Sequence, residues 1–148
     1  MKKLLICAAA LLLLTPLFAD LRYSYDFLAA VNAVADNTTE VHGTDYTSRQ
    51  VDVSSWGAYC GITIEFTPAA GAAVDVTYEF AVSMDNGGTY TTADNYSIAI
   101  PSNTRAVGGV VRYSTVFDLS GVSHIRLDRM IVGNGAGNCT AMQAHVSY

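Results

Sequence analysis

Lysine is almost absent from this chain. The two lysines are Lys2 and Lys3, so residues 20–148 carry six arginines against 13 acidic residues, a net charge of −7 with histidine neutral. Proteins bind nucleic acids and anionic membrane surfaces through Lys and Arg side chains that neutralise phosphate. We therefore expect neither of these as a partner. The same absence leaves residues 20–148 without a lysine for Schiff-base chemistry.

Motifs of the common enzyme classes are missing too. The sequence contains no Gly-x-Ser-x-Gly, no His-Glu-x-x-His and no phosphate-binding loop. Glu65, Asp75 and Glu79 lie at polar positions of two neighbouring predicted strands, where a carboxylate pair for glycoside hydrolysis is conceivable. A solvated acidic face is the interpretation we favour. We predict no catalytic residues, no cofactor and no enzyme activity.

One long apolar run is present, Leu4–Leu14, directly after the two lysines. A positive start, a short apolar run and a small residue, here Ala19, are the parts of a secretory signal peptide. The run is shorter than the roughly 20 apolar residues that span a bilayer, so we expect no membrane insertion. We predict a bacterial-type signal peptide over 1–19, cleaved after Ala19, and a mature protein that is secreted or held at the cell surface.

Cysteine is scarce: Cys7 lies in the predicted signal, which leaves Cys60 and Cys139. In an oxidising compartment two cysteines favour one disulfide. A Cys60–Cys139 bond would close a loop of about 80 residues, for which chain entropy gives on the order of 4–5 kcal/mol of stabilisation. Two separate buried thiols are the alternative. Neither cysteine has the neighbours of a metal site.

Alternation of apolar and polar residues dominates the chain from position 59 onward, which is the pattern of half-buried strands. It predicts strands over 59–66, 73–82, 122–132 and 142–148, and further strands are expected over 46–53, 96–100 and 106–117. In the 122–132 strand, Ile125, Leu127 and Ile131 fall on the buried face. About eight short strands, separated by Gly, Asn, Asp and Ser turns, predict an all-β antiparallel sandwich over 46–148.

Residues 20–45 are predicted to form an extended segment ahead of the sandwich. Apolar side chains alternate there as in a strand, at Leu21, Tyr23, Tyr25 and Phe27. The apolar positions from 27 to 34 also fit a short helix, but we favour the extended form. Because this segment is more apolar than a chain terminus in water needs, we predict that Leu21–Val34 is an assembly arm, which pairs with the sheet edge of another subunit.

Several short motifs resemble those of the discoidin-like (galactose-binding-like) jelly-roll family. They are Val51-Asp-Val53, Gly61-Ile62, Val76-Thr-Tyr78, Ser83-Met-Asp85 and Ile125-Arg-Leu127. Small β-sandwich modules of phage virion proteins are similar too. The resemblance implies a jelly-roll arrangement of the strands and, for the first family, a glycan-binding role.

Two groups of residues are candidates for ligand binding. Trp56, Tyr59, Tyr90 and Tyr96 supply aromatic faces on which sugars stack, although packing inside the sandwich is the alternative role for them. The segment Ser83–Tyr90 predicts a tight hairpin and resembles the Asp-box of sialidase-type propellers, in which the Asp accepts backbone hydrogen bonds. The oxygen atoms of Asp85, Asn86 and Asp94 also suit calcium, but a turn without metal is the interpretation we favour.

These observations leave three functions open. The first is a non-enzymatic structural subunit that assembles with copies of itself, or docks on a cell-surface protein, in an extracellular structure. It fits the signal, the missing motifs and the scarcity of Lys and Pro, the residues that protect sheet edges from pairing. The second is a glycan-binding jelly-roll module. The third is a small outer-membrane barrel, for which most predicted strands are too short. We favour the first, as a specific oligomer or filament.

Overall fold

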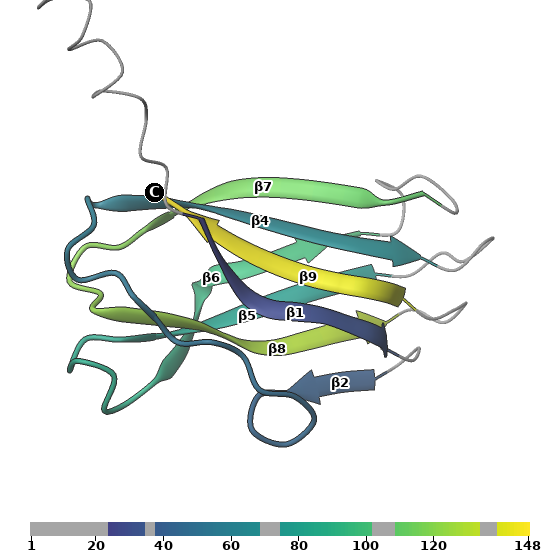
Figure 1. Cartoon of the computed structure of the whole chain (residues 1–148), viewed down its shortest axis with the longest axis horizontal. Coiled ribbons are helices and arrows are strands. Elements are labelled where there is room, and N and C mark those ends of the chain that lie inside the picture. Colours follow the sequence, from purple (N-terminus) through teal and green to yellow (C-terminus); the bar gives the residue numbers. More distant parts are fainter. Residues whose placement is uncertain (1–23, 35–37, 69–74, 102–108, 134–138) are drawn as a thin grey trace, which may run out of the picture.

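The computed structural model describes residues 24–34, 38–68, 75–101, 109–133 and 139–148. Within these ranges the chain is entirely β, with nine strands and no helix (Figure 1). The strands are β1 (Ser24–Val34), β2 (Thr38–Val41), β3 (Val51–Asp52), β4 (Tyr59–Pro68), β5 (Asp75–Ser83), β6 (Thr91–Ile100), β7 (Val111–Asp118), β8 (His124–Gly133) and β9 (Cys139–Ser147). Nothing in these ranges is a helix long and apolar enough to cross a membrane.

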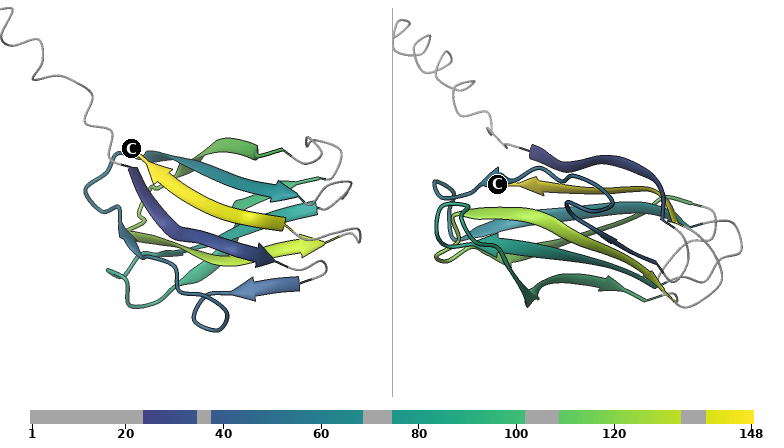
Figure 2. Two further views of the ribbon diagram at one scale, coloured as in Figure 1. Left: turned by 45° about the vertical axis from the view of Figure 1, so that its right-hand side comes forward. Right: turned by 90° about the horizontal axis from the view of Figure 1, so that it is seen from below.

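The strands form two antiparallel sheets that lie face to face (Figure 1, Figure 2). The first sheet has the order β1-β9-β4-β7 and the second the order β2-β8-β5-β6, with β3 also paired to β8. If β2 and β3 are counted as two pieces of one strand along β8, the pairs are nested: β1 with β9, β2/β3 with β8, β4 with β7, and β5 with β6. This is the strand order of a jelly roll. The predicted all-β sandwich is confirmed.

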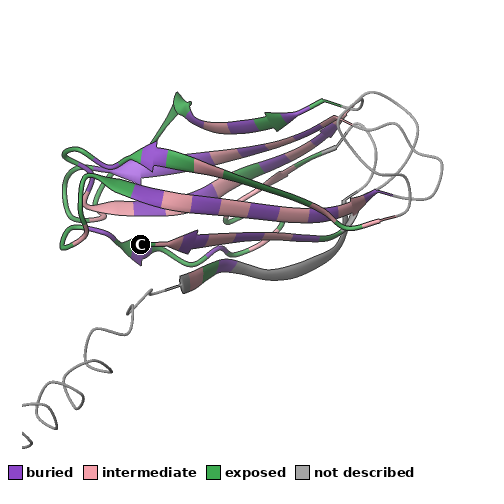
Figure 3. Ribbon diagram, turned by 90° about the horizontal axis from the view of Figure 1, so that it is seen from above, coloured by how far each residue is buried: buried purple, intermediate pink, exposed green. Residues whose placement is uncertain are grey.

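One apolar core fills the space between the sheets. The inward faces of β4 and β5 are those that the alternation predicted: Cys60, Ile62, Ile64, Phe66, Val76, Tyr78 and Phe80 are all at most 2% exposed. Buried and less buried residues therefore follow each other in bands along the strands (Figure 3). Tyr78 donates its hydroxyl hydrogen to the carbonyl oxygen of Glu65 at 2.9 Å, so its buried polar atom is satisfied.

Strand β8 departs from the predicted alternation at its centre. Glu79 of β5 pairs with Arg129, but the next residue, Phe80, pairs with Leu127. Asp128 is therefore an extra residue, a β-bulge, and beyond it the inward positions change phase. Met130 and Val132 are fully buried and Ile131 is only half-buried, so the prediction of Ile131 on the buried face was wrong.

Strand β1 belongs to the sandwich of its own chain. The predicted extended start is confirmed over Ser24–Val34, and this strand pairs with β9. Phe27 is 1% exposed and packs on Phe80, with 5.3 Å between ring centroids. The prediction that Phe27 contacts another subunit was therefore wrong. The predicted start of the sandwich at position 46 was wrong too, because β1 is one of its strands. Leu21 and Tyr23 lie outside the described residues.

The predicted Cys60–Cys139 disulfide is not formed. Cys139 lies opposite Pro68, at the far end of β4 from Cys60. Eight residues of strand separate the two positions, about 26 Å at the usual rise per residue, whereas a disulfide needs Cα atoms within about 7 Å. Both side chains are buried in the core, and burial raises the pKa of the Cys60 thiol to about 11. The two cysteines are therefore separate buried thiols, which was the alternative interpretation.

Candidate functional site

Three described loops meet at one end of the sandwich, next to the C-terminus. They are the segments 53–58, 84–90 and 119–123. Backbone hydrogen bonds join them to one another and to the strands: Leu119 N donates to Ala58 O at 2.7 Å, and Ser123 N to Ser83 O at 2.8 Å. The loops 53–58 and 119–123 line a hollow of about 350 Å³. This end of the molecule is therefore a shallow surface, held in place by hydrogen bonds between the loops, to which a ligand could bind.

Trp56 lies in that hollow and belongs to an aromatic stack. Its ring stacks on Tyr148, with centroids 5.0 Å apart, and on Tyr25, with centroids 5.8 Å apart. The guanidinium of Arg49 lies 5.0 Å from the centre of the Tyr25 ring, a favourable cation–π contact. The stack ties the start of β1, the 53–58 loop and the C-terminus together, so part of the ring surface of Trp56 already has a structural role.

The other aromatic candidates have separate surroundings. Tyr59 is 62% exposed at the start of β4. Tyr90 lies beneath the guanidinium of Arg126, 4.1 Å from its ring centre. Tyr96 is 7% exposed, and its hydroxyl donates to the carbonyl oxygen of Asp118 at 2.7 Å. Trp56 and Tyr59 thus belong to the same end of the sandwich, while Tyr96 is a core residue.

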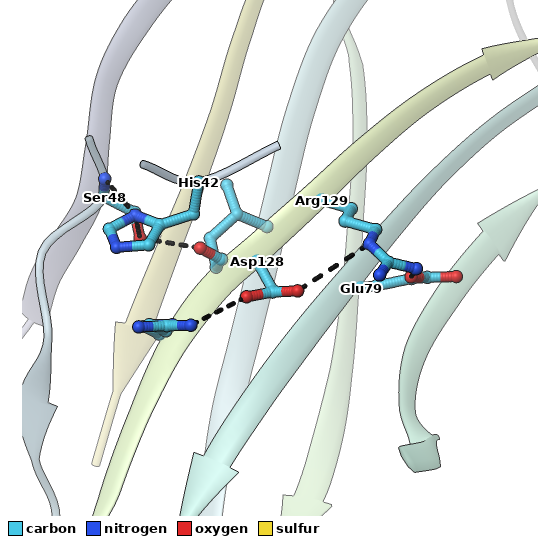
Figure 4. A network of polar contacts seen from close by, with 7 residues as sticks. His42, Ser48, Glu79, Asp128 and Arg129 are labelled. Carbon is cyan, nitrogen blue, oxygen red and sulfur yellow. Dashed lines mark hydrogen bonds and ion pairs between the residues drawn. The ribbon is translucent and has the colours of Figure 1, made fainter. Parts of the chain in front are cut away.

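A polar network surrounds the bulge of β8 (Figure 4). The Asp128 carboxylate lies 3.1 Å from Arg126 and 3.8 Å from Arg129, and Arg129 lies 3.4 Å from Glu79. The backbone nitrogen of His42 donates to the carbonyl oxygen of Asp128 at 2.8 Å. The charged groups of this network therefore pair with one another, within β8 and between β8 and β5, and we assign them a structural role.

The same network holds the 42–48 loop against β8. Ser48 N donates to His42 Nδ1 at 3.0 Å, and the Ser48 hydroxyl donates to Leu127 O at 2.6 Å. Burial, and then the positive charge of Arg126, lower the pKa of His42, so the ring is neutral and accepts the hydrogen bond. The sequence analysis missed this role of His42 because its partners are more than 80 residues away or in an irregular loop.

The hairpin between β5 and β6 has the predicted tight turn. Asp85 Oδ1 accepts hydrogen bonds from the Ser83 hydroxyl at 2.6 Å and from Thr89 N at 2.8 Å. Asn86 and Gly87 have φ angles of 61° and 83°, the left-handed conformation that Asn and Gly tolerate best. Asp94 lies elsewhere, in a hollow beside Glu79 and Arg129. The structure therefore does not bring the three predicted calcium ligands together, and no group of three potential metal ligands occurs among the described residues.

The Asp85 turn makes a prediction for the pH dependence of stability. The hydrogen bonds from Ser83, and then those from Thr89, lower the pKa of Asp85 to about 2, against about 3.9 in an unfolded chain. The charged carboxylate thus stabilises the fold above about pH 4, and this contribution is lost as the pH falls towards 2. In Asp85→Asn the loss of thermal stability between pH 4 and 2 should be smaller than in the wild type. Ser83→Ala should change the profile in the same direction, and an unchanged Asp85→Asn profile would contradict the assignment.

A second hollow lies on the outer face of the second sheet, where β6 arches away from β5. Ala81 pairs with Thr92 but Glu79 pairs with Ser97, so four residues of β6, 93–96, oppose the single residue Phe80 of β5. The space beneath the arch is about 430 Å³ and is lined by Glu79, Thr92, Ala93, Asp94, Ser97 and Arg129. It is polar and open, and Glu79 is already paired with Arg129.

Large apolar side chains are exposed along β7 and the adjoining start of β4. Tyr59, Val110, Tyr113 and Val116 are 48–66% exposed, and we call them the β7 strip. Ile64 pairs with Tyr113 and Gly61 with Val116, so Tyr113 lies on the inner face at the open side of the sandwich and Val116 on the outer face. The sequence predicted a strand here, but alternation alone carries no signal that the strand is an edge.

The comparisons with known proteins bear on the fold. No protein family and no curated protein matches the chain. Among solved structures, it is similar to the VP2 subviral particle of infectious bursal disease virus (13% identity, TM-score 0.53) and to the structure of the Gx strain of that virus (13% identity, TM-score 0.52). Each likeness covers 86% of this chain and 33% of the viral chain, so this chain spans about a third of the length of the proteins it matches. This chain and the viral proteins share a β-sandwich fold.

Proposed function

We propose that the chain is a non-enzymatic structural subunit, exported from a bacterial cell, that assembles with copies of itself into an extracellular or cell-surface structure. The β7 strip is the observation that carries this proposal. Large apolar side chains that are exposed along one sheet edge mark a candidate interaction site, and the buried centre of a subunit interface is enriched in such side chains. The sandwich fold, shared with a protein that forms a subviral particle, supports the same role.

Assembly is tested on the whole chain, produced with its own first 19 residues in a bacterial host. Protein purified from the exported fraction without detergent should sediment as an oligomer whose mass rises with concentration, and electron microscopy should show a regular particle or filament. Detection of the protein only inside the cytoplasm would contradict the proposed export. A monomer at the highest attainable concentration would contradict the proposed assembly.

Glycan binding is the second candidate function, and the hollow beside Trp56 favours it. Sugars bind on aromatic rings, and the loop end offers the ring of Tyr59, which is 62% exposed, and the half-buried ring of Trp56, which lines the hollow. A glycan array separates the two functions. A monomer that binds a glycan, and that loses this binding in Trp56→Ala but retains it in Tyr96→Phe, would replace the first proposal by the second.

A further inference from the structure

A jelly roll of two sheets has four edge strands, and three of them here are irregular or short. β1 has two register shifts against β9, one between Asp26 and Leu28 and one between Leu28 and Val31. β2 and β3 have only four and two residues. β6 carries the arch at 93–96, where its pairing with β5 is interrupted. Short strands and bulges are the features that keep a sheet edge from pairing with another chain.

Strand β7 has none of these protective features. Its eight residues pair with β4 in one uninterrupted register, from Phe66 opposite Val111 to Tyr59 opposite Asp118. Within the described part of the chain no strand pairs with its other side, and β7 contains neither Lys nor Pro. Its outer main-chain groups can therefore continue the hydrogen bonds of the first sheet into a second chain.

We propose that β7 pairs antiparallel with β7 of a second copy of this chain, so that the two four-stranded sheets join across a two-fold axis at Thr115. The inference rests on the proposed function and names the surface that performs it. In an antiparallel two-fold contact, a residue that lies some number of positions before the axis on one strand faces the residue that lies the same number of positions after the axis on the other strand. With the axis at Thr115, Arg112 of each copy lies opposite Asp118 of the other.

The charges of β7 favour this register over its neighbours. Arg112 and Asp118 are the only charged residues of the strand and lie on the same outward face, because they are an even number of residues apart. An axis at Arg112 or at Asp118 would place like charges opposite each other. A shift of the axis to Ser114 would leave both charges without an opposite charge. Only the axis at Thr115 makes two complementary pairs, and it also places Val116, which is 66% exposed, opposite Ser114 of the second copy.

Both charged groups have atoms to spare for this contact. The Arg112 side chain is 67% exposed and its ion pair with Glu65, at 2.7 Å, uses Nε rather than the two Nη nitrogens. Asp118 is exposed, and its Oδ1 accepts a hydrogen bond from Ser120 N at 2.8 Å. Hydrogen bonds from Ser120 lower the pKa of Asp118, so this carboxylate is charged at neutral pH.

Charge exchange tests the pairing on the full chain. In Arg112→Asp the interface has two Asp–Asp contacts, and in Asp118→Arg it has two Arg–Arg contacts. Each variant should raise the dimer dissociation constant, measured by sedimentation velocity, roughly tenfold or more. The double variant Arg112→Asp with Asp118→Arg exchanges the signs and should recover most of the affinity. Thermal unfolding of each variant shows that the fold is retained.

A matched control comes from the other sheet. Asp52 accepts a hydrogen bond from Ser54 N at 2.9 Å, in the way that Asp118 accepts one from Ser120 N. Asp52→Arg therefore makes the same change of charge and breaks the same kind of turn, but at the end of the two-residue strand β3. It should leave the dimer dissociation constant at the wild-type value.

Cysteine cross-linking tests the register. In the proposed pairing the two Thr115 Cα atoms are about 5 Å apart, whereas the two Ser114 Cα atoms are roughly 8 Å apart, beyond the reach of a disulfide. Thr115→Cys should give a covalent dimer on mild oxidation and Ser114→Cys should not. Cys60 and Cys139 are buried, so they add little background.

The outcomes separate the pairing from the proposed function. An assembly that is unchanged by both single charge variants, with Thr115→Cys not cross-linked, overturns the pairing and leaves the proposed function in place. A wild-type monomer at every concentration overturns both. A dimer that responds as expected but never grows into a larger structure supports the pairing and counts against an extended assembly.

Discussion

Replacement of Phe27 by alanine is expected to lower the free energy of unfolding by about 3–5 kcal/mol. The ring is 1% exposed and packs on Phe80 at the centre of the core. Its strand is paired with β9 on both sides of this residue, at Asp26 and Leu28, which limits how far β1 can move to fill the cavity that alanine leaves. Denaturation by urea, followed by circular dichroism, measures the change from the transition midpoint and slope.

Asp26→Ala is the matched control on the same strand. Its side chain is 68% exposed and contacts His145 at 2.5 Å on the outer face of the first sheet. Loss of an exposed pair costs about 1 kcal/mol or less. Equal effects of the two substitutions would show that β1 is a separate arm, and the deletion of 24–34 would then leave a folded sandwich. We expect that deletion to unfold the protein, since it removes Phe27 and uncovers β9.

Met130→Ala should destabilise the protein by about 2–5 kcal/mol, whereas Ile131→Ala should cost about 1 kcal/mol or less. Met130 is fully buried opposite Tyr78, and Ile131 is half-buried opposite Thr77. Strict alternation from Leu127 predicts the reverse order of effects. Comparison of the two substitutions therefore shows whether the inward-facing positions of β8 shift by one residue at Asp128.

Leu127→Ala provides the reference for this comparison. Leu127 lies before the bulge and is fully buried, so both alternation and structure predict a loss similar to that of Met130→Ala. If Ile131→Ala is as destabilising as Leu127→Ala while Met130→Ala is tolerated, β8 has no bulge. The position of Asp128 between Arg126 and Arg129 would then also be wrong.

Parts of the candidate sites could be predicted from local sequence and parts could not. The turn at Asp85 follows from Ser83, Asp85 and the glycines after it, all within a few residues. The aromatic candidates were found by residue type, but type alone does not separate Trp56, at the loop end, from Tyr96, in the core. The edge position of β7 has no local signal, because a strand with one neighbour and a strand with two can have the same alternation.

The sequence by itself determined the fold class and the inward faces of β4 and β5. Facing is a local property: each residue of a strand points opposite to the one before it, so alternation and burial must agree. The tertiary structure alone decided the pairing of the strands. It placed Cys139 of β9 beside the end of β4 that is far from Cys60, joined β1 to the sandwich, and put the bulge of β8 at Asp128. These features depend on which distant segments lie side by side, and that choice is made by the packing of the whole core rather than by any short stretch of residues.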